Sequence, residues 1–285
     1  MIKRAVDVLR GRVHPLDAVE AALPRIARDG PASGPAYDPA AARLVLSPHL
    51  DDAVLSCWGE LSADGEVVVV NVFTAAPDTA DCSLYDRIAG ATDARVRMEE
   101  RAAEDRNALA LSGRAPRNLD FLECAYRRRA PAARQLLRAL GGYCPAASAV
   151  LAPAGIGSHP DHLLVRDAAL LLRRGGMPVE LYADMPYCAA YGWPAWVTGQ
   201  PSRVNLVIDA YWEPALDAVR ARDRTLTGVP RTLTREERAS KLEAMRRYAT
   251  QYPSLTRGPV DVLAHPDVLG FELKWRVEDG STPEA

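Results

Sequence analysis

The stretch Val67-Val-Val-Val-Asn-Val-Phe73 decides the fold, because an unbroken β-branched run is typical of a strand that is buried on both faces of a parallel sheet. Arg43–Ser47 predicts a shorter buried strand before it. Further strands are predicted at residues 119–124, 149–152, 179–183, 204–208 and 271–277. Helices are predicted at residues 54–61, 93–111, 130–140, 160–174, 210–224 and 235–248. This alternation predicts an α/β fold, a Rossmann-like, doubly wound, mostly parallel sheet flanked by helices.

Pro and Gly residues indicate a domain boundary near residue 42. Residues 1–42 end in Gly30, Pro31, Gly34, Pro35 and Pro39, and we interpret them as an N-terminal extension. Residues 43–285 are expected to form one domain. Its Rossmann-like core spans about 43–185, and C-terminal helical and strand additions on the substrate side span about 186–285.

Composition excludes several classes of protein. The 35 Lys and Arg residues balance 37 Asp and Glu residues, so no basic surface for nucleic acid is expected. No segment reaches the 18 apolar residues that span a bilayer, which argues against stable membrane insertion. The 5 cysteines form no CxxC pair, which favours a reducing, cytoplasmic location. Association into a homo-oligomer is left open.

Two short clusters contain three of the chain's 5 histidines. His49-Leu-Asp-Asp52 follows the first predicted strand, and His159-Pro-Asp-His162 follows the strand at 149–152. The carboxyl ends of parallel strands lie at one edge of a sheet, where ligands bind, so we expect the two clusters to form one site.

The side chains of these clusters suit a catalytic metal. Two imidazoles and a carboxylate are a donor set that Zn²⁺ accepts, and three protein ligands leave a position open for water. A carboxylate that is not a ligand can then take a proton from that water. The clusters therefore predict metal-assisted hydrolysis with one Zn²⁺ per chain, although another divalent metal is not excluded at this point.

The motifs Ser47-Pro-His-Leu-Asp-Asp52 and Gly157-Ser-His-Pro-Asp-His162 resemble the two signature motifs of the PIG-L (LmbE-like) zinc de-N-acetylases. That family includes deacetylases of glycopeptide, aminoglycoside and mycothiol biosynthesis. The resemblance implies specific roles for six residues of this chain. His49, Asp52 and His162 would bind zinc, Asp51 would be the general base, His159 would stabilise the tetrahedral intermediate or protonate the leaving amine, and Asp161 would orient His159.

Two departures from the family bear on the substrate side. A tyrosine that helps to polarise the carbonyl in the mycothiol-pathway deacetylase corresponds to Gly157 here, so that role is vacant or filled elsewhere. An expected Asp after the third strand is Glu123. The predicted substrate-binding residues are Arg101, Glu123, Arg127, Tyr187, Tyr191 and Trp193, of which the aromatic ones would stack on a sugar or wall off an acyl chain.

The sequence thus predicts a zinc-dependent hydrolase that removes an N-acetyl or other N-acyl group from a small amino-sugar conjugate, in secondary-metabolite or thiol-cofactor biosynthesis. Two alternatives remain open at this point. A metal-dependent phosphoesterase would use a similar donor set, usually with two metals. A non-catalytic carbohydrate-binding protein would keep the site as a relic.

Overall fold

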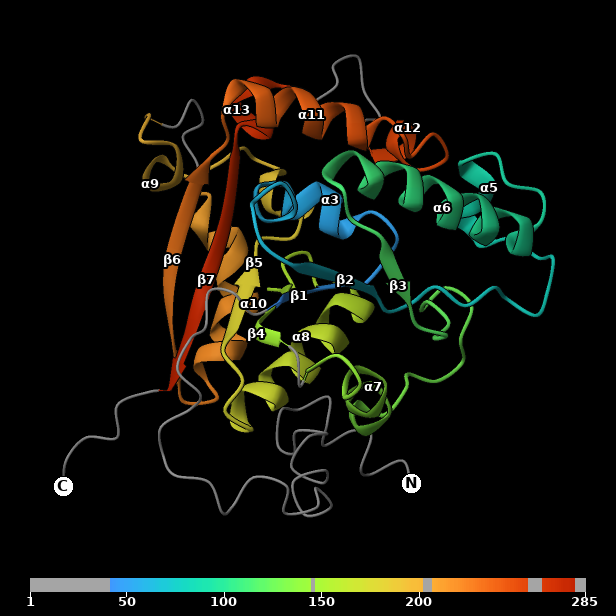
Figure 1. Ribbon diagram of the computed structural model, residues 1–285, viewed down its shortest axis with the longest axis horizontal. Coiled ribbons are helices and arrows are strands. Elements are labelled where there is room, and N and C mark those ends of the chain that lie inside the picture. Colours follow the sequence, from blue (N-terminus) through green and yellow to red (C-terminus); the bar gives the residue numbers. More distant parts are fainter. Residues whose placement is uncertain (1–41, 145–146, 202–206, 256–262, 280–285) are drawn as a thin grey trace.

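The computed structural model describes residues 42–144, 147–201, 207–255 and 263–279. Their centre is a 7-stranded sheet in the order β3-β2-β1-β4-β5-β7-β6 (Figure 1). Strands β1 to β5 run parallel to one another, whereas β7 is antiparallel to both β5 and β6. The strands are β1 (Ala42–Ser47), β2 (Val67–Asn71), β3 (Pro116–Asn118), β4 (Ala147–Pro153), β5 (Val179–Tyr182), β6 (Arg224–Thr232) and β7 (Phe271–Asp279).

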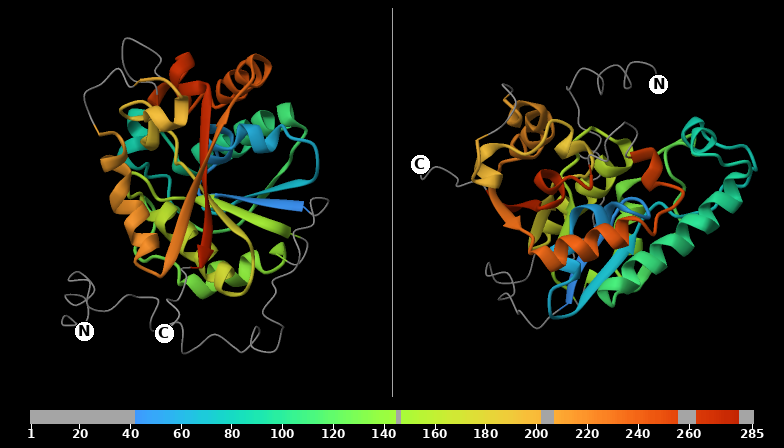
Figure 2. Two further views of the ribbon diagram at one scale, coloured as in Figure 1. Left: turned by 90° about the vertical axis from the view of Figure 1, so that its left-hand side faces the viewer. Right: turned by 90° about the horizontal axis from the view of Figure 1, so that it is seen from above.

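Helices cover both faces of this sheet. The layer drawn above the sheet in Figure 1 contains α3, α6 and α11, and the layer below it contains α7, α8 and α10; Figure 2 shows the same layers from two other sides. The helices are α3 (Asp52–Ser56), α4 (Trp58–Leu61), α5 (Leu84–Ile88), α6 (Ala94–Leu109), α7 (Ala133–Leu140), α8 (Pro160–Arg174), α9 (Ala195–Thr198), α10 (Asp209–Arg220), α11 (Arg235–Met245), α12 (Tyr252–Leu255) and α13 (Pro266–Leu269), with short 3₁₀ helices η1 (Ala110–Ser112) and η3 (Tyr187–Ala189). The predicted doubly wound architecture is confirmed.

The apolar strands of the sequence form the core. Val69 and Val70 in β2, and Val45 and Leu46 in β1, have no exposed surface. Because side chains of successive strand residues point to opposite faces, this burial requires helices on both sides of the sheet. Strand β2 therefore lies between two helical layers.

Three details of the predicted strands are wrong or incomplete. The third strand is Pro116–Asn118 rather than 119–124, because β2 ends at Asn71 and offers no parallel partner beyond its pairing with Asn118. Residues 119–124 form a loop that makes one antiparallel bridge, from Phe73 to Asp120. The predicted strand at 204–208 falls largely outside the described residues, and β6 was not predicted.

The predicted boundary at residue 42 and the N-terminal extension fall almost entirely outside the described residues, so the domain division stays a prediction. Within the described ranges, no helix combines the length and apolar character that crossing a bilayer requires.

Candidate active site

The two sequence clusters meet at the carboxyl edge of the sheet. β1 pairs with β4, and β4 pairs with β5, so the segments that follow these three strands are neighbours. Asp51 precedes the first residue of α3, and His159 caps the amino end of α8 by accepting a hydrogen bond from the backbone N–H of Asp161 at 3.3 Å. The strand-to-helix turns therefore aim both clusters into one space, as expected from the sequence.

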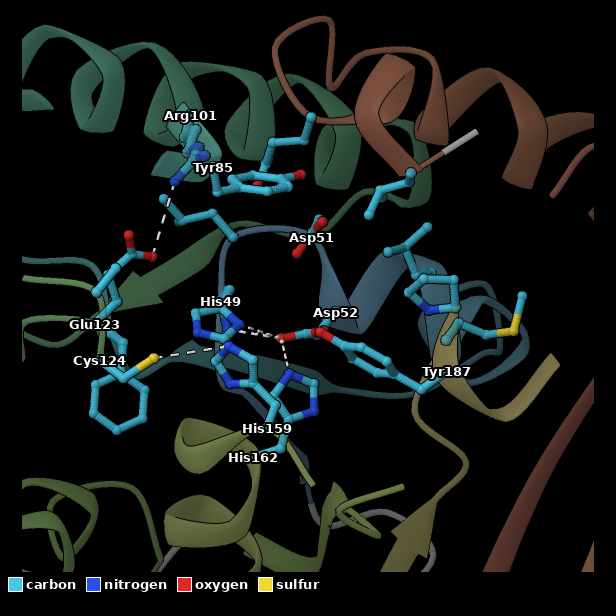
Figure 3. A pocket seen from close by; sticks show the side chains of 18 of the residues that line it. His49, Asp51, Asp52, Tyr85, Arg101, Glu123, Cys124, His159, His162 and Tyr187 are labelled. Atoms are coloured by element: carbon cyan, nitrogen blue, oxygen red, sulfur yellow. Dashed lines mark hydrogen bonds and ion pairs between the residues drawn. The ribbon is translucent and has the colours of Figure 1, made fainter. Parts of the chain in front are cut away.

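Two imidazole side chains converge on one carboxylate oxygen of Asp52 (Figure 3). Oδ2 of Asp52 lies 3.3 Å from Nδ1 of His49 and 3.3 Å from Nε2 of His162. Asp52 and His162 are almost fully buried, with 4% and 1% of their surface exposed. The imidazoles of His49, His159 and His162 also hold ring nitrogens within 4.8 Å of one another. The site is therefore a compact group of metal-ligating atoms.

The far nitrogens of two of these imidazoles contact buried carboxylates. Nε2 of His49 lies 3.0 Å from Oδ2 of Asp161, and Nδ1 of His162 lies 2.7 Å from Oδ1 of Asp184. A carboxylate acceptor fixes the N–H on the far nitrogen and leaves the near nitrogen with its lone pair free. His49 Nδ1 and His162 Nε2 are thus oriented as electron-pair donors toward the same point.

Asp184 is a site residue that the sequence analysis missed. It has no exposed surface, and its Oδ2 accepts hydrogen bonds from the backbone N–H groups of Gly155 and Ile156, at 2.9 and 3.0 Å. It lies two residues after the end of β5, at the same edge of the sheet as both histidine clusters. That position was the available signal, and the carboxylate joins β5 to the loop after β4.

Asp161 has other partners than the expected one. Its carboxylate contacts His49, pairs with the guanidinium of Arg127 and accepts from the backbone N–H of Cys124 at 2.9 Å. Burial alone would raise its pKa, but His49 and Arg127 outweigh burial and lower the pKa to about 2. Only its backbone N–H, and not its carboxylate, contacts His159, so the carboxylate orients His49 instead. Its near-complete burial explains why a charged pair with Arg127 is needed.

The pKa values of Asp51 and His159 are shifted in opposite directions. Burial and the adjacent Asp52 carboxylate raise the pKa of Asp51 to about 7. Burial, together with His49 and His162, lowers the pKa of His159 to about 4. A carboxylate with a pKa near 7 suits proton abstraction at neutral pH, and a neutral imidazole beside it suits hydrogen bonding to a polar substrate group. The arrangement is that of an acid–base site.

A cavity of about 300 Å³ opens above these groups. It combines the polar groups already described with an apolar wall, and further polar groups line its far side. Its lining residues include Leu50, Leu55, Phe73, Ser83, Tyr85, Met98, Arg101, Glu123, Cys124, Met185, Pro186, Tyr187, Gln251 and Leu255. A mainly apolar hollow with a few convergent polar groups is typical of a small-molecule site.

Arg101 and Glu123 line the far side of this cavity, as predicted, but Arg101 has protein partners. Its guanidinium pairs with the carboxylate of Asp86 and lies 3.9 Å from that of Glu123. Asp86 is buried, with only 1% of its surface exposed. Tyr126 also donates a hydrogen bond to Asp86. The loop after β2 is therefore folded inward and contributes a charged network to the cavity.

Only some of the remaining predicted residues lie at the cavity. Tyr187 lines it (Figure 3). Trp193 instead lies in the core, where its indole N–H donates to the Val268 carbonyl at 3.0 Å. Tyr191 is 49% exposed and packs against Tyr211. Arg127 supports Asp161 from behind, with its guanidinium 4.7 Å from the centre of the Phe73 ring.

Comparison with known proteins agrees with the motifs. A family model described as "PIG-L: GlcNAc-PI de-N-acetylase" matches residues 44–172. A curated relative, "2'-N-acetylparomamine deacetylase" of Streptomyces fradiae, is 34% identical over 160 residues. That alignment covers 50% of this chain and 57% of the relative, so the chain matches little more than half the length of this relative.

Solved structures extend the likeness beyond the matched residues. The zinc-inhibited form of a teicoplanin deacetylase superposes with a TM-score of 0.65 at 24% identity, covering 85% of this chain and 100% of that chain. The deacetylase of the A40926 pseudoaglycone, an antimicrobial, gives a TM-score of 0.62 at 28% identity, covering 86% and 100%. The matched region holds both histidine motifs and the strands that position them. Residues 44–172 of this chain thus match the PIG-L family model.

Proposed function

We propose that this protein is a zinc-dependent N-deacetylase that acts on an amino-sugar-containing antibiotic precursor. The observation that carries the proposal is the geometry at Asp52. Two imidazole nitrogens face its carboxylate, and each of these imidazoles is held from behind by a buried carboxylate.

The spacing of these atoms fits zinc. Zn²⁺ binds imidazole nitrogen at roughly 2.0–2.1 Å and carboxylate oxygen at roughly 2.0–2.2 Å in tetrahedral sites, which separates neighbouring ligand atoms by about 3.4 Å. The separations from Asp52 to His49 and His162 are both 3.3 Å. We therefore assign His49, Asp52 and His162 as the ligands. A bound Zn²⁺ would lower the pKa of a coordinated water to about 7.

The protein's own groups then supply the proton transfers of amide hydrolysis. Asp51 takes a proton from the attacking water as the water oxygen bonds to the carbonyl carbon. The neutral imidazole of His159 donates a hydrogen bond from Nε2 at the reacting centre, and Asp51 passes the proton that it took from the water to the nitrogen as the carbon–nitrogen bond breaks. Nδ1 of His159 accepts from the backbone N–H of Asp161, which directs Nε2 into the cavity. The products are a carboxylic acid and a free amine.

The relatives indicate the substrate class. Their names specify 2'-N-acetylparomamine, teicoplanin and the A40926 pseudoaglycone as the compounds that those proteins deacetylate. In this chain, Arg101 and Glu123 would contact sugar hydroxyls, and the apolar side chains of Phe73 and Met98 would contact the acyl group or the ring face. An N-acetyl amino sugar joined to a larger aglycone is the substrate that these features favour.

The test combines metal content with amine release. The protein is purified without chelator and assayed with 2'-N-acetylparomamine, with N-acetylglucosamine and with an N-acylglucosaminyl glycopeptide. About one zinc per chain together with amine release is expected. An Asp51→Asn variant should lose about 10²- to 10⁴-fold in kcat while keeping its zinc, and an exposed Asp64→Asn variant should match the wild type.

Other outcomes would contradict the proposal. Full activity of Asp51→Asn would exclude the assigned base. Phosphate release from a sugar phosphate ester without any amine release would favour a phosphoesterase. Stoichiometric sugar binding that survives Asp51→Asn, with no turnover, would favour a carbohydrate-binding protein.

A further inference from the structure

Gly157 and Tyr187 are in direct contact beside the three histidines. A Cβ atom built on Gly157 would lie 2.6 Å from Cγ and 2.7 Å from Cδ1 of the Tyr187 ring, which no real side chain permits. Gly157 also has a φ of +85°, a conformation that residues with a side chain rarely adopt. The ring of Tyr187 therefore occupies the space into which a side chain at position 157 would project.

Tyr187 is held in place by its own backbone and by His162. The N–H of Cys188 donates to the carbonyl of Asp184 at 2.8 Å, which ties the short helix η3 to the end of β5. The ring of Tyr187 meets the imidazole of His162 edge-on, with the ring centres 5.7 Å apart. Figure 3 shows the side chain reaching from η3 toward Asp52, along the side of the cavity opposite Glu123 and Cys124.

The hydroxyl of Tyr187 is available to a ligand. Among the described residues it has no hydrogen-bond partner, and its side chain lines the cavity. Burial and the nearby carboxylates of Asp52 and Asp51 raise the pKa of this phenol above its usual range. A phenol hydroxyl can donate a hydrogen bond to a polar group of a ligand.

We propose that the hydroxyl of Tyr187 donates a hydrogen bond to the carbonyl oxygen of the scissile amide and stabilises the charge that this oxygen gains. The inference rests on the proposed function. As the water oxygen bonds to the carbonyl carbon, the π-electron pair moves onto the carbonyl oxygen. When the carbon–nitrogen bond breaks, that pair returns to re-form the carbonyl. The tyrosine keeps its proton throughout, and the nitrogen leaves with the proton that Asp51 took from the water.

This assignment explains why residue 157 is a glycine. Donors aimed at a developing oxyanion act most strongly in a cavity that excludes water. The hydroxyl here comes from the segment after β5 rather than from the loop after β4, and glycine at 157 makes room for it. Gly157 is then a positioning residue, and Tyr187 is the catalytic one.

The first test compares Tyr187→Phe with Tyr143→Phe, which removes a hydroxyl from a tyrosine packed against the core outside the cavity. Both are made in the full chain and assayed with the best N-acetyl substrate of the panel. Tyr187→Phe is expected to lower kcat about 100-fold, with KM within about threefold and zinc content unchanged. A rise in KM at constant kcat would overturn the inference, because it would leave the ring only a stacking role.

A second readout does not depend on turnover. A methylphosphonyl derivative of glucosamine places a tetrahedral, charged centre where the amide reacts. Tyr187→Phe should weaken its binding by the same factor by which kcat/KM falls, while the affinity for the product glucosamine stays the same. Equal affinity of wild type and Tyr187→Phe for the phosphonyl compound would overturn the inference.

The role of Gly157 is tested by a double-mutant cycle. Gly157→Ala should displace the ring and lower kcat about as much as Tyr187→Phe. In a Tyr187→Ala background, where the ring is absent, Gly157→Ala should change kcat less than about threefold. Equal losses in both backgrounds would show that the contact is irrelevant. If the wild type is active and Tyr187→Phe has the same kcat, this inference alone is overturned. If the wild type is inactive and also fails to bind the phosphonyl compound, the proposed function and this inference are overturned together.

Discussion

Replacing Asp184 by asparagine tests whether the buried carboxylate behind His162 sets the metal affinity. Both oxygens of Asp184 are in use. Oδ1 accepts from Nδ1 of His162 at 2.7 Å, and Oδ2 accepts from the N–H groups of Gly155 and Ile156. Asparagine offers one acceptor oxygen and one NH₂ group. Either His162 or the pair of backbone amides must therefore face a donor in place of an acceptor.

The expected magnitude follows from the role of such carboxylates. Loss of the acceptor behind a metal-bound imidazole lowers metal affinity by roughly 10- to 100-fold, which corresponds to about 1.4–2.8 kcal/mol. If the amide turns its oxygen toward His162 instead, two backbone N–H groups lose their partner, at about 1–3 kcal/mol for each buried group left unsatisfied. The variant must then lose metal affinity, stability or both.

The assay is competition for Zn²⁺ against a chromophoric chelator at pH 7, paired with urea unfolding of the chelator-treated protein. The control is Asp167→Asn, on the same helix as His162. Asp167 pairs with Arg222 at 2.9 Å, outside the site, and its loss should leave zinc affinity unchanged. A folded Asp184→Asn variant with the zinc affinity and the stability of the wild type would refute the reasoning.

Two further predictions concern stability. Burial raises the pKa of Asp105 from 3.8 to about 7, against hydrogen bonds from Tyr248 and Asn71. The folded state therefore binds more protons than the unfolded chain between about pH 4 and pH 7, so the free energy of unfolding should fall as pH rises through this window. Urea titrations at pH 5 and pH 8 should show this fall in the wild type and a smaller fall in Asp105→Asn. An equal fall in both proteins would contradict the prediction. Lys241, with no exposed surface, lies 2.7 Å from the carboxylate of Glu272. Lys241→Met should lower the free energy of unfolding by about 3–5 kcal/mol. Adding Glu272→Gln to this variant should recover part of that loss. A loss below about 1 kcal/mol in Lys241→Met would show that the ion pair is effectively solvated.

The sequence predicts the part of the site that depends on strand order alone. His49, Asp52 and His162 each follow a buried apolar strand, and parallel pairing of β1 with β4 brings them together. The geometry confirms that these residues converge. That both histidine clusters lie in strand-to-helix turns follows from local patterns that no distant contact alters.

What the sequence does not predict depends on distant contacts. Asp184 carries no motif, and its role arises only because β5 lies beside β4. Trp193 resembled a substrate-stacking residue, yet it packs against Trp212 in the core. The strand β6 was missed because its Thr-Leu-Thr-Gly-Val-Pro pattern has no buried alternation; it is an edge strand paired only with β7. Pairing partners, rather than local composition, decide such segments.

The walls of the cavity and its floor come from different parts of the chain. The floor consists of the turns after β1 and β4, whose side chains are locked by buried carboxylates. Ser83 and Tyr85 at α5, Tyr187 at η3, and Gln251 and Leu255 around α12 form much of the wall. Short connecting segments tolerate changes that strand ends do not. Changes in these wall segments would alter the shape of the cavity while leaving the groups of its floor in place.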